Sequence, residues 1–154
     1  MKLTIISVGR KSSPEIAKLC AEYEKRLSSS FHIDWQLIEP IAGKMKRLEQ
    51  RERESEKILS GISDSEFVIL LDETGKRLNN HQLAASFSKW LGVAKNPIFV
   101  IGGAFGVSEK LKNRANVIWS LSDLVFPHEM VRVILVEQIY RTHSIINNLP
   151  YHNG

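Results

Sequence analysis

Residues 66–72, EFVILLD, form an unbroken run of five apolar side chains between two acidic ones. A strand with one face in water alternates apolar and polar residues, whereas this run has no polar face. Such a pattern is typical of a strand that is covered on both faces, as in a parallel sheet flanked by helices. The segment therefore predicts an α/β fold and decides how the rest of the chain is interpreted.

Strand and helix patterns alternate on both sides of this segment. Further strands are predicted at 3–8 (LTIISV), 31–38 (FHIDWQLI), 97–103 (PIFVIGG) and 117–121 (VIWSL). The alternation in 31–38 predicts a half-buried strand with these side chains inward: Phe31, Ile33, Trp35 and Leu37. Helices are predicted after the Ser13–Pro14 cap, over 44–57, after the loop 73–80 (ETGKRLNN), at 108–115 and from near Pro127. We expect one α/β domain over 1–154, with a mainly parallel sheet flanked by helices.

The composition is that of an ordinary globular protein, with 43% hydrophobic and 25% charged residues. No apolar run reaches the roughly 18 residues of a membrane span, and the opening MKLTIISVGRK does not resemble a signal peptide. We therefore expect a cytoplasmic protein that does not bind membranes. The single Cys20 lies on the apolar face of its helix and is expected in the core.

Positive charge predominates, because 21 Lys and Arg residues outnumber 17 Asp and Glu residues and the net charge is +4. This favours a polyanionic partner without requiring one. The segment 44–57 holds six basic and four acidic residues and is predicted to be an exposed helix, with Glu49 and Arg53 close enough to pair. Such a segment is usually a solvated face, and contact with RNA is the alternative.

Gly102, Gly103 and Gly106 follow the strand 97–103, and Asp123 lies about 20 residues further on, as a ribose-binding carboxylate does in dinucleotide sites. The first glycine of that fingerprint is missing, because its position holds Ile101. The glycines therefore indicate either a tight turn or a close approach of the backbone to another ligand.

Metal and triad chemistry have little support in the sequence. His128 and Glu129 begin like the zinc motif H-E-x-x-H, but Arg132 stands where the second histidine is required. No G-x-S-x-G nucleophile turn is present. We expect no metal ion.

The last helix is apolar around its whole circumference, although charged residues interrupt it. Its apolar residues are Met130, Val131, Val133, Ile134, Leu135, Val136, Ile139 and Tyr140. A helix that is apolar all round is buried all round, and one sheet covers only one side of it. A second copy of the chain in a two-fold homodimer is the simplest cover. Arg132, Glu137 and Arg141 should then be partly buried, and either paired or functional.

Four segments resemble the ribosomal RNA large subunit methyltransferase H family: LLDETGK (70–76), FVIGGAFGV (99–107), WSLSDLVFPHEMVRVILVEQIYR (119–141) and NLPYHNG (148–154). They recur in the order and at the spacing of the family. The resemblance covers most of the chain and is strongest from residue 66 onward, whereas 28–60 is less distinctive. The family consists of SPOUT-class enzymes that methylate N3 of a pseudouridine in a stem-loop of 23S rRNA.

The resemblance implies a trefoil knot in the C-terminal half, a homodimer, S-adenosylmethionine as cofactor, and 23S rRNA in the ribosome or the large subunit as substrate. The positions that it assigns to the cofactor are Leu71, Gly102, Leu121, Ser122, Asp123, Leu124, Val125 and Phe126. Gly103 joins them because it lets backbone approach a ligand. All of them follow predicted strands, where ligands of open α/β sheets bind.

The implied reaction requires loss of the N3 proton, so a general base or nearby cations are needed. The candidates are His128, Arg132, Tyr151 and His152. His128 or His152 is the expected base or orienting group, and Arg132 is expected to contact phosphate or uracil.

Three alternatives stay open: a methyltransferase of the same class with another RNA target, a non-catalytic RNA- or ribosome-binding dimer, and a nucleotide-dependent oxidoreductase, which Ile101 disfavours. Without the resemblance, the residues predict only an α/β dimer with a ligand loop near 102–106 and a basic bias.

Overall fold

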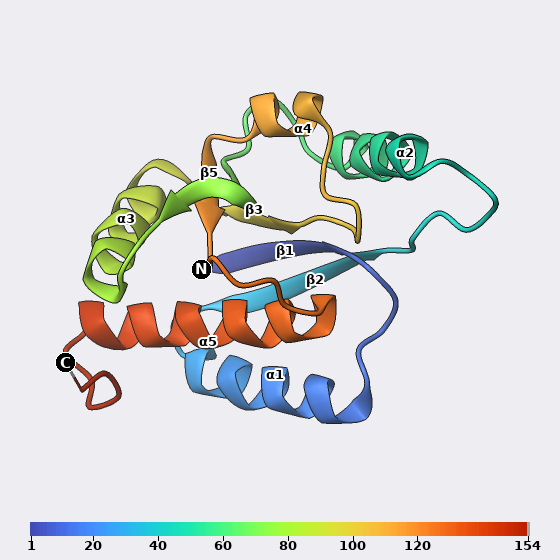
Figure 1. Cartoon of the computed structure of the whole chain (residues 1–154). Helices are drawn as coiled ribbons and strands as arrows, with labels where there is room; N and C mark the ends of the chain where they lie inside the picture. The colour runs from blue at the N-terminus through green and yellow to red at the C-terminus, as the bar shows by residue number, and fades with distance from the viewer. Residues whose placement is uncertain (154) are drawn as a thin grey trace.

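The computed structural model describes residues 1–153, in which five strands alternate with five helices (Figure 1). The elements are β1 (Lys2–Val8), α1 (Pro14–Leu27), β2 (His32–Ile38), α2 (Arg47–Ser60), β3 (Val68–Arg77), α3 (Asn80–Val93), β4 (Ile98–Ile101), α4 (Glu109–Arg114), β5 (Val117–Ser120) and α5 (His128–Ile146). The strands form one sheet in the order β2-β1-β4-β3-β5, and every neighbouring pair is parallel. The predicted α/β fold with a parallel sheet flanked by helices is confirmed.

The apolar run that predicted this fold is covered on both faces. Val68, Ile69 and Leu70 are each 0% exposed. Ile69 belongs to the core on the side of α1, α3 and α5, while Val68 and Leu70 belong to the core on the side of α2 and α4. Successive side chains of a strand point to opposite faces, so a run without polar residues needs a helical layer on each face.

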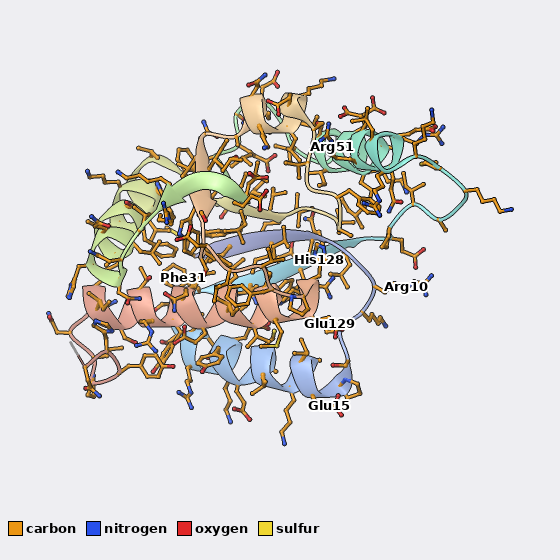
Figure 2. All side chains as sticks on the ribbon, viewed as in Figure 1. Arg10, Glu15, Phe31, Arg51, His128 and Glu129 are labelled. Atoms are coloured by element: carbon orange, nitrogen blue, oxygen red, sulfur yellow. The ribbon has the colours of Figure 1, made fainter. Side chains whose placement is uncertain are left out.

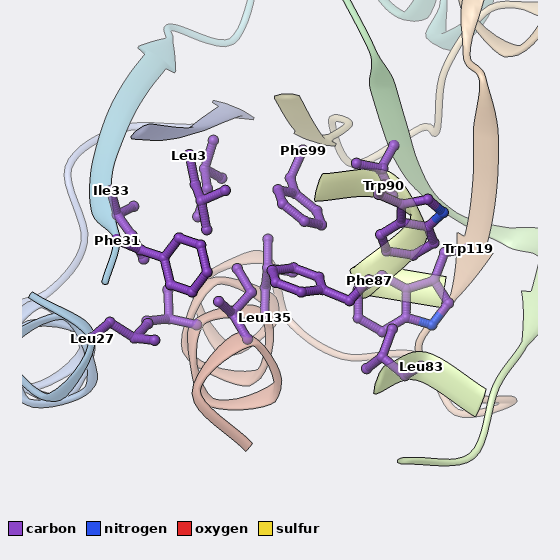
Figure 3. Close-up of a cluster of buried hydrophobic side chains, with 14 of the residues drawn as sticks. Leu3, Leu27, Phe31, Ile33, Leu83, Phe87, Trp90, Phe99, Trp119 and Leu135 are labelled. Carbon is purple, nitrogen blue, oxygen red and sulfur yellow. The ribbon is translucent and has the colours of Figure 1, made fainter. Parts of the chain in front are cut away.

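The larger core is rich in aromatic rings (Figure 3). The rings of Phe87 and Phe99 stack with their centroids 6.3 Å apart, and Phe31 meets Phe87 edge-on at 6.0 Å. Trp90 and Trp119 extend the cluster toward β5. Aromatic side chains contribute much of the burial energy of a small domain, and these contacts fix α3 on the sheet.

β3 is longer than predicted, because it continues through residues that were expected in the loop 73–80. The strand runs to Arg77 and pairs again with β5 after a register shift between Leu71 and Lys76. Gly75 makes this possible, since a Cβ there would lie 2.6 Å from the carbonyl carbon of Ile118. The close approach of two backbones explains why a segment with turn-like composition forms a strand.

Two further predictions differ from the structure in detail. Leu37 was expected to point inward but is 40% exposed, because β2 is the edge strand of the sheet. The charged helix begins at Arg47 rather than at residue 44. Cys20 is buried as predicted, and this burial raises the pKa of its thiol to about 11.

α5 packs between α1 and α3 on one face of the sheet (Figure 1). Leu135, Val136 and Ile139 are at most 2% exposed and enter the core. Met130 on the outer side is 43% exposed, and Val133 is half-buried. The single chain therefore covers one side of α5 and leaves apolar side chains on the other.

Candidate functional site

The carboxyl ends of β3, β4 and β5 surround a pocket of about 650 Å³. It is called here the cofactor pocket, after the residues that were predicted to bind a cofactor and that line it. Its walls come from the ends of these strands and the loops after them, and from the first turn of α5. All nine residues that were predicted to bind the cofactor line it: Leu71, Gly102, Gly103, Leu121, Ser122, Asp123, Leu124, Val125 and Phe126. Parallel strands end at the same edge of a sheet, which is why segments far apart in the sequence meet there.

The glycine loop after β4 forms one wall of this pocket. A Cβ on Gly102 would lie 2.5 Å from Cγ1 of Val107, and Gly106 has φ +77°. Gly103 and Gly106 form an isolated antiparallel bridge, so the loop folds back on itself. The glycines thus make a tight turn, as one interpretation of their spacing required, and this turn lines the pocket. The approach of a ligand to their backbone stays a prediction.

The loop 121–126 forms another wall. Leu124 and Val125 are 72% and 87% exposed, although both are apolar. The backbone of the loop is held by the Ser122 hydroxyl, which accepts from the backbone N–H of Leu124 at 3.0 Å. Asp123 forms an ion pair with Arg77 of β3. An ordered loop that presents apolar side chains is suited to an apolar ligand or a partner surface.

Asp72 was not among the predicted site residues, yet it lines the cofactor pocket just after Leu71. Burial raises its pKa, but hydrogen bonds from Thr74 and the charge of Lys112 outweigh this effect, so the pKa lies below its ordinary value. The Lys112 ammonium is 3.4 Å from Asp72 Oδ1. The carboxylate therefore stays ionised at neutral pH and places negative charge beside the pocket.

His128 is the first residue of α5 and lines the cofactor pocket. Burial lowers the pKa of its imidazole, and the charge of Arg132 lowers it further, against smaller opposing effects of Glu54 and the Gly103 backbone. Its Nδ1 is buried and has no hydrogen-bond partner among residues 1–153. The ring is therefore neutral at pH 7 and can accept a proton.

Arg132 lies one turn further along α5 but points into the protein. It is 2% exposed, and its guanidinium donates to Ser7 Oγ at 3.0 Å, to the carbonyl of Arg10 at 2.8 Å and to Ser12 Oγ at 2.9 Å. Gly9 has φ +144°, and a Cβ there would lie 2.4 Å from Nη2 of Arg132. The arginine thus holds the loop between β1 and α1 against the start of α5.

Glu129 secures the same loop, because its Oε1 accepts from the backbone N–H of Ser13 at 2.7 Å. Figure 2 shows Arg10, His128 and Glu129 on the side of the molecule where α5 begins. The loop therefore presents Arg10 and Lys11 close to His128, and all of them line one smaller pocket. This arrangement places positive charge at the edge of the site.

Tyr151 and His152 form a separate group with Glu137 and Arg141. The hydroxyl of Tyr151 donates to Glu137 Oε1 at 3.1 Å, and Arg141 Nη1 lies 3.2 Å from His152 Nδ1. Arg141 also pairs with Glu137 at 2.6 Å. From residue 128 to residue 141, α5 rises about 20 Å. The structure thus divides the four predicted catalytic residues between the two ends of α5.

Glu54 was missed because the segment 44–57 was expected to be an exposed helix. Glu49 and Arg53 pair on its outer side at 2.7 Å, as predicted. Glu54 and Ser55 are nevertheless 1% exposed, as is Ile58 on the same helix. Ile58 was the only apolar signal for this buried face, and it lies just beyond the predicted segment.

Two classes of site have no structural support within the described residues. No group of three or more His, Cys, Asp or Glu residues among 1–153 could hold a metal ion. No helix among the same residues has the length and hydropathy needed to span a membrane.

A family model described as "Predicted SPOUT methyltransferase" matches residues 1–152. A protein of Methylobacillus flagellatus is 41% identical over 155 residues, covering 99% of both chains. One of Xylella fastidiosa is 38% identical over 156 residues, covering 100% of this chain and 99% of its own. One of Maridesulfovibrio salexigens is 35% identical and covers 99% of this chain and 98% of its own. Each of the three is named ribosomal RNA large subunit methyltransferase H.

Proposed function

The chain belongs to the SPOUT methyltransferase family, among the methyltransferases of large-subunit ribosomal RNA, and from this premise we propose its substrate and mechanism. The proposed reaction moves a methyl group from S-adenosylmethionine to N3 of a pseudouridine in a stem-loop of 23S rRNA. The observation that carries the proposal is the convergence of nine cofactor positions on one pocket of about 650 Å³. They come from three separate strand ends, in a chain that matches the family over its whole length.

The chemistry of the pocket suits S-adenosylmethionine. Its volume lies within the range of about 300–1,000 Å³ that small-molecule sites occupy. Leu121, Leu124 and Phe126 would contact the apolar surfaces of the cofactor, and the glycine loop would provide backbone donors and acceptors. The ionised Asp72 would favour a ligand that carries positive charge, as a sulfonium does. When bound, the cofactor supplies an electrophilic methyl group.

The residues of the chain must then orient the base and remove its N3 proton. We assign proton removal to His128, which is neutral at pH 7 and lines the cofactor pocket. A positioned base of this kind contributes typically about 10²–10⁴-fold to a rate. We assign Arg132 to holding the loop, because its Nε and Nη1 donate to Ser7, the Arg10 carbonyl and Ser12.

The remaining predicted catalytic residues point to a homodimer. Tyr151 and His152 lie at the far end of α5 from the cofactor pocket of their own chain. A two-fold partner that packs on the uncovered side of α5 would bring its tail to that pocket and would bury Met130 and Val133. Two chains would also carry a net charge of about +8, twice +4, which favours binding to RNA.

Three further assignments belong to the same proposal. Residues 1–154 are one domain, which is supported by the single sheet that contains every strand among residues 1–153. The C-terminal half is knotted, and this rests on the family resemblance. The protein acts in the cytoplasm, because its ribosomal substrate is found there.

The decisive experiment is incubation with labelled S-adenosylmethionine and either assembled ribosomes or large subunits that lack the modification. We expect one label per 23S rRNA, located at N3 of a pseudouridine. A label on another nucleotide or another RNA would show that the protein is a methyltransferase of the same class with a different RNA target. Cofactor binding by calorimetry without methyl transfer would instead support a non-catalytic RNA-binding dimer.

A further inference from the structure

A second pocket, of about 200 Å³, lies beside the cofactor pocket and shares Gly103, Ala104 and His128 with it. It is called here the Glu54 pocket, because Glu54 of α2 lines it. Glu54 is 1% exposed and forms no ion pair with any residue among 1–153. A carboxylate is rarely buried without a cationic partner, so its position calls for an explanation.

The two carboxylate oxygens of Glu54 have different surroundings. Oε1 accepts from the backbone N–H of Ile41 at 3.2 Å and from Nε2 of Gln50 at 2.8 Å. Oε2 faces Gly103, where a Cβ would lie 2.1 Å from it, and it has no donor among residues 1–153. An unpaired buried acceptor is unfavourable. Oε2 is thus placed for a donor from outside the chain.

The pocket is suited to a nucleotide rather than to a single water. One water needs only about 10–15 Å³ of such space. Arg10 and Lys11 line the same pocket and bring positive charge, which suits a ligand attached to phosphates. His128 adds a second buried polar atom, its Nδ1, at the shared wall. A flat polar ring between the two pockets would meet both groups.

We propose that the Glu54 pocket receives the target base and that Oε2 of Glu54 accepts a hydrogen bond from N1–H of pseudouridine. This inference rests on the proposed function, because it concerns the base whose N3 receives the methyl group. Pseudouridine is joined to ribose through C5, so its N1 carries a hydrogen. Uridine has a C5–H at the corresponding place, and the N3 edge of the two bases is the same. An acceptor at the N1 edge therefore distinguishes them.

The shape of the base is compatible with this arrangement. N1 and N3 lie on different edges of the ring, so N3 can face the cofactor pocket while N1–H faces Glu54. The ribose leaves from C5, on the side of the ring away from both. Gly103 supports the arrangement, because any side chain there would collide with the Glu54 carboxylate.

A buried acceptor of this kind would discriminate strongly between pseudouridine and uridine. A site built around a hydrogen bond to the substrate can reject an analogue that lacks the donor by about 10⁴-fold or more, since the protein group is left unpaired. Glu54 would thus determine which base is methylated, whereas His128 would act on the N3 proton that both bases have.

The test is the variant Glu54→Gln, which replaces one carboxylate oxygen, an acceptor, with an NH₂ group, a donor. The amide oxygen remains where Ile41 and Gln50 donate, so the NH₂ group takes the place of Oε2 and cannot accept from N1–H. We would measure kcat/KM with ribosomes, and separately with large subunits, that carry either pseudouridine or uridine at the target. Glu54→Gln should lower the ratio of the two values by at least about 10-fold. The ratio is unaffected by partial unfolding, which lowers both rates alike.

The matched control is Glu56→Gln, which removes the same charge from an exposed position on α2. It should keep the wild-type ratio. If uridine is methylated too slowly to measure, the ratio of Kd values for the two RNAs replaces the ratio of rates. A Glu54→Gln protein with the wild-type ratio, or a wild-type protein that does not discriminate, would overturn the inference. If wild type and Glu56→Gln methylate neither RNA, the proposed function itself fails.

Discussion

His128 is the first residue of a long helix, and its ring is partly buried beside a glycine loop. A helix N-terminus carries partial positive charge, which disfavours the protonated imidazole. Burial and the charge of Arg132 act in the same direction. The ring is thus prepared to take a proton rather than to give one at neutral pH.

A pH profile tests this assignment. Because the pKa of His128 lies below its ordinary value of 6.5, the neutral form persists to lower pH, and kcat/KM should fall only below that value. His128→Ala should lower turnover about 10-fold or more and remove this acid limb. The exposed His32 offers the control, since His32→Ala should leave rate and profile unchanged. An acid limb centred at or above pH 6.5 would contradict the assignment.

Replacing Arg132 is expected to affect the stability of the fold more directly than the methyl-transfer step. Arg132→Ala removes three hydrogen bonds and leaves Ser7, Ser12 and the Arg10 carbonyl without their donor. We expect a loss of about 3 kcal/mol in the free energy of unfolding, or a melting temperature lower by roughly 10 °C. Thermal or urea unfolding measures this effect.

Two further variants separate geometry from charge. Arg132→Lys keeps the charge but lacks the planar fork, so it should recover less than half of the lost stability. Lys18→Ala removes one positive charge from an exposed position on α1 and should be neutral. An Arg132→Ala protein with wild-type stability but low turnover would show that the guanidinium contacts the substrate directly.

At the scale of elements, the loop between β5 and α5 carries two side chains, Leu124 and Val125, that line the cofactor pocket but contribute little to the core. Replacing Leu124 and Val125 with Ser should therefore leave the melting temperature unchanged, since they are 72% and 87% exposed. The affinity for S-adenosylmethionine should fall about 10-fold, because apolar contact area is lost. Isothermal titration calorimetry measures it.

Val93→Ser is the matched control, because Val93 is also 72% exposed but ends α3, outside the cofactor pocket. It should keep the wild-type affinity. Equal affinities of the double variant and the wild type for S-adenosylmethionine would show that these two side chains of the loop do not contact the cofactor.

At the scale of the whole molecule, the separation of His128 from Tyr151 and His152 leads to a test by mixing. In the proposed dimer, each active site combines His128 of one chain with the tail of the other. Pure His128→Ala and pure His152→Ala proteins should both be weakly active. A refolded equal mixture should recover about one quarter of wild-type activity, because half of the dimers are mixed and each has one intact site.

The mixture also distinguishes other arrangements. If His128 and His152 of the same chain acted together, no mixed dimer would contain an intact site and no activity would return. Sedimentation equilibrium of the two variants checks that they still form dimers. A monomeric wild-type protein would exclude the shared site altogether.

Much of the fold could be predicted because local patterns agreed with it. EFVILLD indicated a strand covered on both faces, and the strand is 0% exposed at Val68, Ile69 and Leu70. Leu37 was predicted wrongly because alternation shows which side chains share a face but does not show that the face lies at the sheet edge. The end of β3 was also missed, since the pairing that extends it depends on β5.

The sequence by itself determined the class of fold and the family, and it predicted which loops line the pocket at the strand ends. These properties depend on local periodicity, on glycine spacing and on motifs, and each of these can be recognised in a short stretch of sequence. Only the tertiary structure decided that Arg132 is enclosed, that Glu54 is buried and that the candidate catalytic residues are separated along α5. The physical reason is that burial and pairing of a charged side chain depend on which distant segments enclose it. A charged residue looks the same in the sequence whether water or a pocket surrounds it.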